Sequence, residues 1–337
     1  MRSALIIGLA GEALRAEERS LLSASRPAGI ILFARNCASK AQVRRLVEDA
    51  RSAIGEDHLL VLIDQEGGRV RRLKPPEWRD LPAAAAFGRL HANDPSLALA
   101  RARLVARLTA AELGEIGINA NCAPVLDVPQ SGAHQIIGDR AYGDDAATVA
   151  ALGRAVAEGL LAGGVVPVIK HVPGHGRARA DSHVELPVVD ARLSELEGSD
   201  FVPFRALRDL PAAMTAHVVY SAIDPEAPAS TSPRVTADVI RGTIGFDGLL
   251  MSDDICMAAL SGSARARAEA VIRAGSDIAL HCNGELAEAE SAAAGVPALA
   301  EVPLQRYLRA IAALERVDAF DSGEAVAALS EMLQPMA

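Results

Sequence analysis

The sequence predicts an α/β protein built as a single (β/α)8 barrel of the TIM type. Eight short apolar runs follow one another along the 337 residues, and helical patterns separate them. Each run is continuously apolar rather than alternating, as expected of parallel strands that are buried on both faces. The length suits one such barrel, and no linker or change of composition divides the chain. We therefore expect one domain over residues 1–337, with an open, doubly wound sheet as the alternative.

The expected strands are the apolar runs, taken in chain order. They are Ala4–Ala10, Gly29–Phe33, Leu60–Asp64, Ile118–Val128, Val166–His171, Ala213–Val219, Leu249–Asp253 and Ile278–His281. Ser39 can cap a helix that ends at Gly55, and Asp94 with Pro95 opens a second helix that runs to about Gly117. Further helical patterns cover residues 145–162, 192–207, 235–243, 263–274 and 302–315.

Charge and composition exclude several classes of function. The net charge of −9 and the aromatic content of 3% argue against a nucleic-acid-binding protein, which needs a basic surface and stacking side chains. No apolar run approaches the ~20 residues of a membrane span, and the first run is more typical of a strand than of a signal peptide. The four cysteines lie far apart, which favours a reducing compartment. We expect a soluble, cytoplasmic protein.

Polar side chains gather where the predicted strands end, and barrels carry their active sites at that end. Asp64 ends the third strand, Asp127 the fourth, His217 the sixth and Asp253 the seventh. The densest group is the segment Lys170–His183, which holds three histidines, a lysine and an aspartate among glycines and prolines. This composition is typical of a functional loop rather than of a packed core.

Within that segment, Asp181 and His183 are two residues apart. A carboxylate hydrogen-bonded to a histidine sets its tautomer and tunes its pKa, which suits acid/base catalysis. Asp253 ends an apolar strand and has the placement expected of a nucleophile or general base. Asp254 should point away by strand alternation, and we expect it to cap a helix or form a salt bridge.

Two other kinds of site are compatible with these residues. His171, His175 and His183, together with Asp181, could ligate zinc, although Pro173 and Gly174 break the helical spacing that zinc motifs use. Lys170, at a strand end, could form a Schiff base with a carbonyl substrate in a lyase.

Four ordered motifs identify a family resemblance. The segments I-D-Q-E-G-G-R-V, K-H-V-P-G-H-G, D-S-H and S-D-D resemble glycoside hydrolase family 3, and in particular its short β-N-acetylhexosaminidases of bacterial peptidoglycan recycling. They occupy Ile63–Val70, Lys170–Gly176, Asp181–His183 and Ser252–Asp254. The resemblance covers essentially the whole chain. The sequence departs from the family's pattern at Val172, where a phenylalanine is usual, and at Ile255 and Cys256.

The resemblance implies a barrel without a second domain, and a retaining exo-β-N-acetylglucosaminidase that needs no cofactor and no metal. Asp253 would be the nucleophile, His183 the acid/base and Asp181 its orienting partner. The sugar-binding side chains would be Asp64, Arg72, Arg140, Lys170 and His171.

The implied substrate is a small muropeptide or disaccharide in which N-acetylglucosamine is β-1,4-linked to anhydro-N-acetylmuramic acid. No nucleic acid or membrane partner is expected, and a monomer is the default. Because a neutral imidazole does not repel an anion, phosphate could replace water as acceptor, which would make the protein a glycoside phosphorylase.

Overall fold

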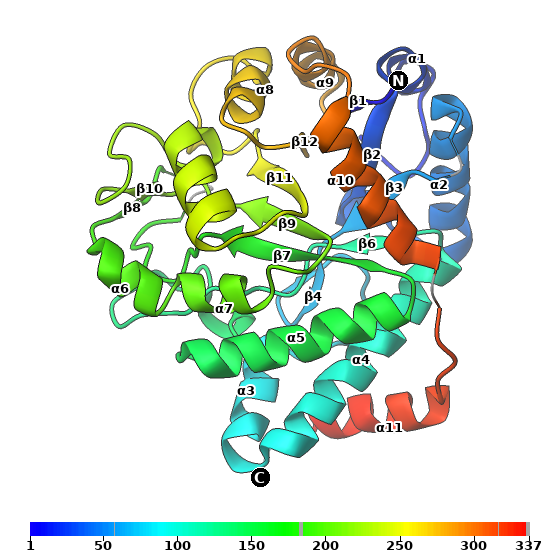
Figure 1. Ribbon diagram of the computed structural model, residues 1–337. Helices are drawn as coiled ribbons and strands as arrows, with labels where there is room; N and C mark the ends of the chain where they lie inside the picture. Colours follow the sequence, from blue (N-terminus) through cyan, green and yellow to red (C-terminus); the bar gives the residue numbers. More distant parts are fainter. Residues whose placement is uncertain (57, 182–184, 316, 335–337) are drawn as a thin grey trace.

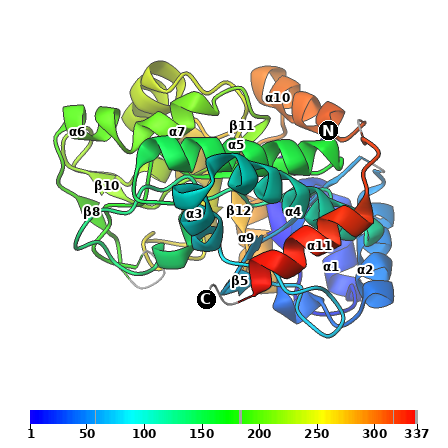
Figure 2. The ribbon, with the colours of Figure 1, turned by 90° about the horizontal axis from the view of Figure 1, so that it is seen from below.

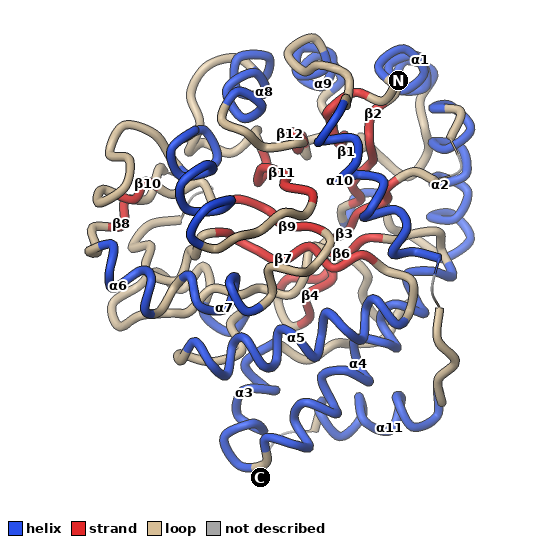
Figure 3. Tube along the Cα trace, viewed as in Figure 1, coloured by secondary structure: helices blue, strands red, loops and turns tan. Residues whose placement is uncertain are grey.

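The computed structural model describes residues 1–56, 58–181, 185–315 and 317–334. Eight parallel strands form a closed barrel in the order β1-β12-β11-β9-β7-β6-β3-β2, which confirms the predicted fold class and excludes the open sheet. In Figures 1 and 3 the helices lie around the outside of these strands. The barrel closes at β1, where Ile7 is paired with Ile30 on one side and with His281 on the other.

Each of the eight predicted runs overlaps one barrel strand. The strands are β1 (Ser3–Gly8), β2 (Pro27–Leu32), β3 (Leu60–Ile63), β6 (Ala120–Asn121), β7 (Val166–Val172), β9 (Ala212–Thr215), β11 (Leu249–Asp254) and β12 (Ile278–His281). Four further short strands lie outside the barrel and were not predicted as separate elements. They are β4 (Gln65–Gly67), β5 (Val70–Arg71), β8 (Val188–Val189) and β10 (Val219–Tyr220).

Alternation along the strands divides the core into two layers. Side chains such as Ile6, Leu62 and Met251 fill the barrel interior, and their neighbours pack outward against the helices. Helix α10 (Glu301–Ala312) closes the amino-terminal end of the barrel (Figure 1). Its buried Tyr307 hydroxyl makes hydrogen bonds of 2.9 Å and 3.2 Å to the carbonyls of Ala28 and His58. With that end sealed, the carboxyl ends of the strands carry the open mouth.

The expected helix ends are confirmed at three positions. The Ser39 hydroxyl accepts the amide of Gln42 at the start of α2 (Lys40–Ile54), and Gly55 ends that helix in the left-handed conformation. The Asp94 carboxylate accepts the amide of Leu97 at the start of α4 (Pro95–Glu115). The remaining α-helices are α1 (Ala16–Ser25), α3 (Ala84–Asn93), α5 (Ala146–Ala162), α6 (Leu193–Gly198), α7 (Phe201–Ala206), α8 (Ala264–Arg273), α9 (Leu286–Ala293) and α11 (Ser322–Leu333).

Helices α1, α3, α9 and α11 were not predicted. Of these, α11 lies along α4 on the outside of the barrel (Figure 2). The expected helix over residues 235–243 is a π-helix, Val235–Thr243. Among the described residues, no helix combines the length and apolar character that crossing a bilayer requires.

The predicted fourth strand was too long, and so was the sixth, because β9 ends at Thr215. Within the run Ile118–Val128, only Ala120–Asn121 forms a regular strand, and Val125 adds one isolated parallel bridge to Lys170. Pro124, between them, has no amide hydrogen for the sheet. The chain nevertheless continues beside β7, since the amide of Leu126 donates to the carbonyl of Lys170 at 2.6 Å.

The helix predicted over residues 192–207 is two helices, α6 and α7. Gly198 weakens the helix at the break. Just beyond it, Asp200 turns inward, and its carboxylate accepts a hydrogen bond of 2.7 Å from Arg177.

Candidate active site

A small polar cavity of about 230 Å³ opens at the carboxyl ends of the barrel strands. Asp253 from β11 and all five predicted sugar-binding side chains line it. These five are Asp64, Arg72, Arg140, Lys170 and His171. They come from loops and strands far apart in the chain, and barrel closure brings them together.

An ion-pair network joins five of the lining side chains. The Lys170 ammonium lies 2.8 Å from Asp64 and 2.6 Å from Glu66. Glu66 also accepts two hydrogen bonds from Arg140, at 2.8 Å and 2.9 Å. Asp64 accepts one from Arg72 at 2.9 Å. Because each charge has an opposite partner, the network can remain ionised although it is largely buried.

The network determines which groups are charged. Burial alone would raise the pKa of Asp64, but Lys170 and Arg72 outweigh it and hold that pKa well below its usual range. Burial alone would lower the pKa of Lys170, but Asp64 and Glu66 raise it above the ordinary value. Lys170 is therefore a fixed cation rather than a neutral amine, and this disfavours the Schiff-base lyase considered above.

Asp253 lies at the end of β11, among histidines. Burial would raise its pKa, but the neighbouring His171 and His217 and the amide of Asp254 hold the pKa below the ordinary value. The carboxylate is therefore ionised at neutral pH, as a nucleophile must be.

A fully buried carboxylate, Asp127, holds the loop that carries two of the histidines. One oxygen lies 2.6 Å from Nδ1 of His171, and the other accepts the backbone amide of His175 at 2.6 Å. Burial lowers the pKa of His175 to about 4, so this imidazole is neutral at pH 7. Asp127 thus fixes the position of His171 at the edge of the cavity.

The loop that carries His171 and His175 is tightly packed against its neighbours. A Cβ on Gly176 would lie 2.1 Å from the carbonyl oxygen of Val128. Gly174 has a φ of +135° and lies against Asp200. Glycine is required at these positions because the loop backbone lies directly against its neighbours.

The prediction for Asp254 was wrong. Its side chain also lines the cavity, and it neither caps a helix nor forms an ion pair with another described residue. One carboxylate oxygen instead accepts the amides of Cys256 and Cys282, at 2.9 Å and 3.1 Å. Its carbonyl oxygen lies 2.9 Å from Nε2 of the buried His217. Asp254 therefore ties the loop after β11 to the end of β12 and to His217.

Asp181 is half-buried and does not line the cavity, while His183 lies outside the described residues. The zinc site considered above also includes His183. Among the described residues, His171, His175 and Asp181 are not grouped closely enough to share one ion.

Two side chains that the sequence did not assign to the site are integral to its geometry. Glu66 bridges Lys170 and Arg140, and Asp127 holds His171. Glu66 follows a predicted strand and Asp127 lies at the end of one, and that position was the available signal. Their partners, however, lie on other strands, so the pairing is visible only in three dimensions.

A closed parallel barrel with a charged cavity at the carboxyl ends of its strands is the arrangement of a (β/α)8-barrel enzyme. The profile of the glycosyl hydrolase family 3 N-terminal domain matches residues 5–315, and the chain belongs to that family.

Similar proteins bear the names β-hexosaminidase and β-N-acetylglucosaminidase. A β-hexosaminidase of Alkalilimnicola ehrlichii is 43% identical over 283 residues, which are 83% of this chain and 80% of the relative. NagZ from Neisseria gonorrhoeae, solved in complex with N-trifluoroacetyl-D-glucosamine, superposes with a TM-score of 0.88 at 32% identity, covering 99% of this chain and 98% of NagZ.

A family 3 β-N-acetylglucosaminidase from Paenibacillus sp. has a TM-score of 0.85 at 30% identity and is longer. The match covers 98% of this chain and 66% of that protein. With the cavity described above, these relationships make the chain a glycoside hydrolase of the β-N-acetylhexosaminidase type.

Proposed function

We propose that the protein is a retaining exo-β-N-acetylglucosaminidase that acts on peptidoglycan fragments. The observation that carries the proposal is the ionised Asp253 carboxylate in a small polar cavity lined by Lys170, Arg72 and Arg140. The cavity lies below the ~300–1,000 Å³ of sites for drug-sized ligands, which favours a single sugar ring.

In the first step, an Asp253 oxygen attacks the anomeric carbon while the bond to the leaving oxygen breaks. His183 gives its proton to that oxygen. In the second step, His183 takes a proton from water, the water oxygen bonds to the anomeric carbon, and the bond to Asp253 breaks. Asp181 would orient His183 and stabilise its protonated form.

The ion-pair network supports the binding part of the proposal. Asp64 and Glu66 can accept hydrogen bonds from sugar hydroxyls, and Arg72, Arg140 and Lys170 can donate them. Since these charges are already paired, they are held in place before the substrate arrives. The N-trifluoroacetyl-D-glucosamine bound to the NagZ of Neisseria gonorrhoeae supports an N-acetylated glucosamine unit as the ligand.

The proposed aglycone, anhydro-N-acetylmuramic acid with or without peptide, rests on the sequence resemblance. The proposed cytoplasmic location rests on the widely spaced cysteines and the strand-like first apolar run, and a monomer without a cofactor is the default.

The direct test is hydrolysis of 4-nitrophenyl N-acetyl-β-glucosaminide with EDTA present throughout. We expect turnover by the wild type, a loss on the order of 10⁴-fold or more for Asp253→Ala, and a loss of about 10²–10⁴-fold for His183→Ala. Asp190→Ala and His58→Ala, at exposed positions, are the matched controls. The absence of turnover by folded wild type would overturn the proposal.

Two product analyses test the stereochemistry of the proposed reaction and the identity of its acceptor. Retention requires that the β-anomer of N-acetylglucosamine form first, which ¹H NMR resolves. Incubation in phosphate buffer distinguishes hydrolysis from phosphorolysis, because only the latter yields sugar 1-phosphate.

A further inference from the structure

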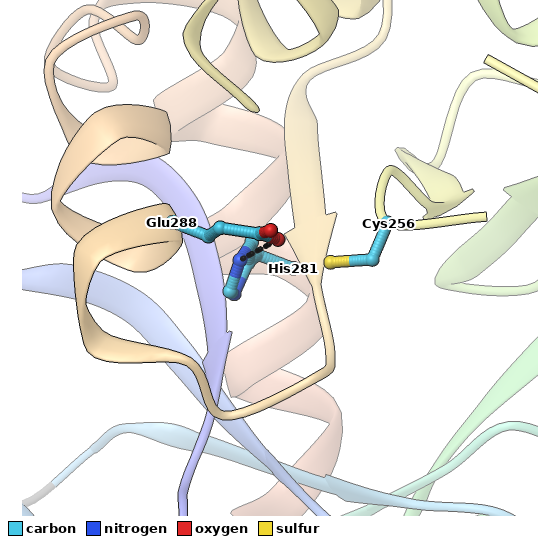
Figure 4. Close-up of side chains that lie close together, drawn as sticks. All are labelled: Cys256, His281 and Glu288. Carbon is cyan, nitrogen blue, oxygen red and sulfur yellow. Dashed lines mark ion pairs between the residues drawn. The ribbon is translucent and has the colours of Figure 1, made fainter. Parts of the chain in front are cut away.

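Three potential metal ligands meet beside the barrel mouth, on segments that the proposed mechanism does not use. Cys256 follows β11, His281 is the last residue of β12, and Glu288 lies on α9. Each offers one ligand atom, and these atoms lie within 4.8 Å of one another. In Figure 4 the Cys256 sulfur and the Glu288 carboxylate both point toward the His281 ring, and the carboxylate is 3.9 Å from Nε2.

His281 is the unusual member of this group. Its side chain is fully buried, yet neither ring nitrogen has a hydrogen-bond partner among the described residues. Buried polar groups are nearly always paired, because an unpaired one costs free energy. Burial also lowers the pKa of His281, so the ring is neutral at pH 7 and has a lone pair for a metal ion.

The group can be reached from solvent by a route separate from the substrate cavity. Cys256 and the exposed Glu288 line a surface cavity of about 340 Å³. In the described part of the chain, this cavity shares no lining residue with the cavity around Asp253. Arg267 also lines it, but its guanidinium is hydrogen-bonded to the carbonyl of Ile255.

We propose that Cys256, His281 and Glu288 bind one divalent cation of the zinc class, with water as the fourth ligand. A thiolate, an imidazole and a carboxylate form a ligand set that Zn²⁺ takes in tetrahedral geometry. Burial raises the pKa of the Cys256 thiol to about 12, so the thiol must release one proton to solvent when the metal binds.

The bound ion would connect α9 and β12 to the loop that follows Asp253. Because it binds only the folded chain, it would raise the midpoint temperature of unfolding. It takes no part in the hydrolysis, so activity in EDTA and metal binding are independent measurements.

Co²⁺ is a suitable probe, because a thiolate ligand gives a charge-transfer band in the near ultraviolet. Histidines and carboxylates at the barrel mouth could also bind the ion, but they give no such band. The full chain, freed of metal and kept reduced with a phosphine, is titrated with CoCl₂. We expect the band to saturate at one equivalent, and Zn²⁺ to abolish it.

The variants assign the ligands. Cys256→Ser should remove the band, Glu288→Gln should weaken Co²⁺ binding at least tenfold, and Zn²⁺ should no longer raise the unfolding temperature of either variant. The matched controls are Cys37→Ser, at another partly buried cysteine, and Glu290→Gln, at an exposed position on α9. Both should behave as wild type. A wild type without the band at excess Co²⁺, or a Cys256→Ser variant that keeps it, would overturn the proposal.

Discussion

Asp127 and His171 form a hydrogen bond of 2.6 Å at a position from which solvent is almost fully excluded. His171 lines the substrate cavity, and Asp127 does not. The second Asp127 oxygen accepts the amide of His175, so one carboxylate holds both a side chain and the backbone of the loop. Asp127 is therefore a positioning residue that acts on the cavity through His171.

Replacing Asp127 with Asn should lower kcat/KM on the order of 10²-fold, because a displacement of about 1 Å at the site has an effect of that size. Asn has one acceptor oxygen where Asp has two, so either Nδ1 of His171 or the amide of His175 loses its acceptor. This should also reduce the free energy of unfolding by about 1–3 kcal/mol. Steady-state kinetics and urea unfolding measure the two effects. The control is Asp209→Asn, whose side chain is 65% exposed and pairs with Arg154. If Asp127→Asn has the kinetics of the wild type, Asp127 is not a positioning residue.

Glu66 should be needed for both stability and substrate binding. Its side chain is 6% exposed and neutralises Lys170 and Arg140. Glu66→Gln leaves two buried cations short of a partner, so we expect a loss of about 3–5 kcal/mol in the free energy of unfolding. We also expect a raised KM. In the control Glu115→Gln, at an exposed ion pair with Lys40, the loss should not exceed about 1 kcal/mol. Equal losses in the two variants would contradict this account.

The free energy of unfolding should fall as the pH is lowered from about 6.5 to 4. His175 has a pKa of about 4 in the folded protein because it is buried, and about 6.5 when unfolded. Protons therefore bind the unfolded chain first, and the shift corresponds to a loss on the order of 3 kcal/mol. Asp127 is depressed to about 2, chiefly by His171 against the opposing effect of burial, so its contribution is lost between about pH 4 and 2.

Urea unfolding between pH 7.5 and 4 measures this slope. We expect His175→Gln to flatten it and the exposed His58→Gln to leave it unchanged. The comparison uses the slope rather than the absolute stability, because replacing a buried side chain has its own cost. A His175→Gln variant with the slope of wild type would assign the acid sensitivity to other groups.

A methyl group at Gly176 should disturb the histidine loop. The new Cβ would overlap the Val128 backbone, which cannot rotate away as a side chain can. We expect Gly176→Ala to cost about 1–3 kcal/mol of stability and to lower kcat. Gly198→Ala is the matched control, since no atom lies within 4 Å of its added Cβ. Wild-type stability and activity in Gly176→Ala would show that the loop can relax without consequence.

The sequence predicted the barrel strands well because burial on both faces leaves a local, continuous apolar pattern. It predicted the caps at Ser39 and Asp94 for the same reason, since a cap involves residues three apart. The predictions from sequence were wrong where contacts between residues far apart in the chain decide the structure. The break between α6 and α7 depends on Asp200 turning toward Arg177, and the role of Asp254 depends on the amide of Cys282.

The sequence by itself therefore determined the class of fold, the end of the barrel that carries polar groups, and part of the cavity lining, namely Asp253 and the five predicted sugar-binding residues. Only the tertiary structure decided which of those groups pair, as Glu66 does with Lys170 and Arg140, and that Cys256, His281 and Glu288 meet. The physical reason is that strand and helix patterns depend on local periodicity. Contacts between strand ends depend on barrel closure and register, which no short segment of sequence encodes.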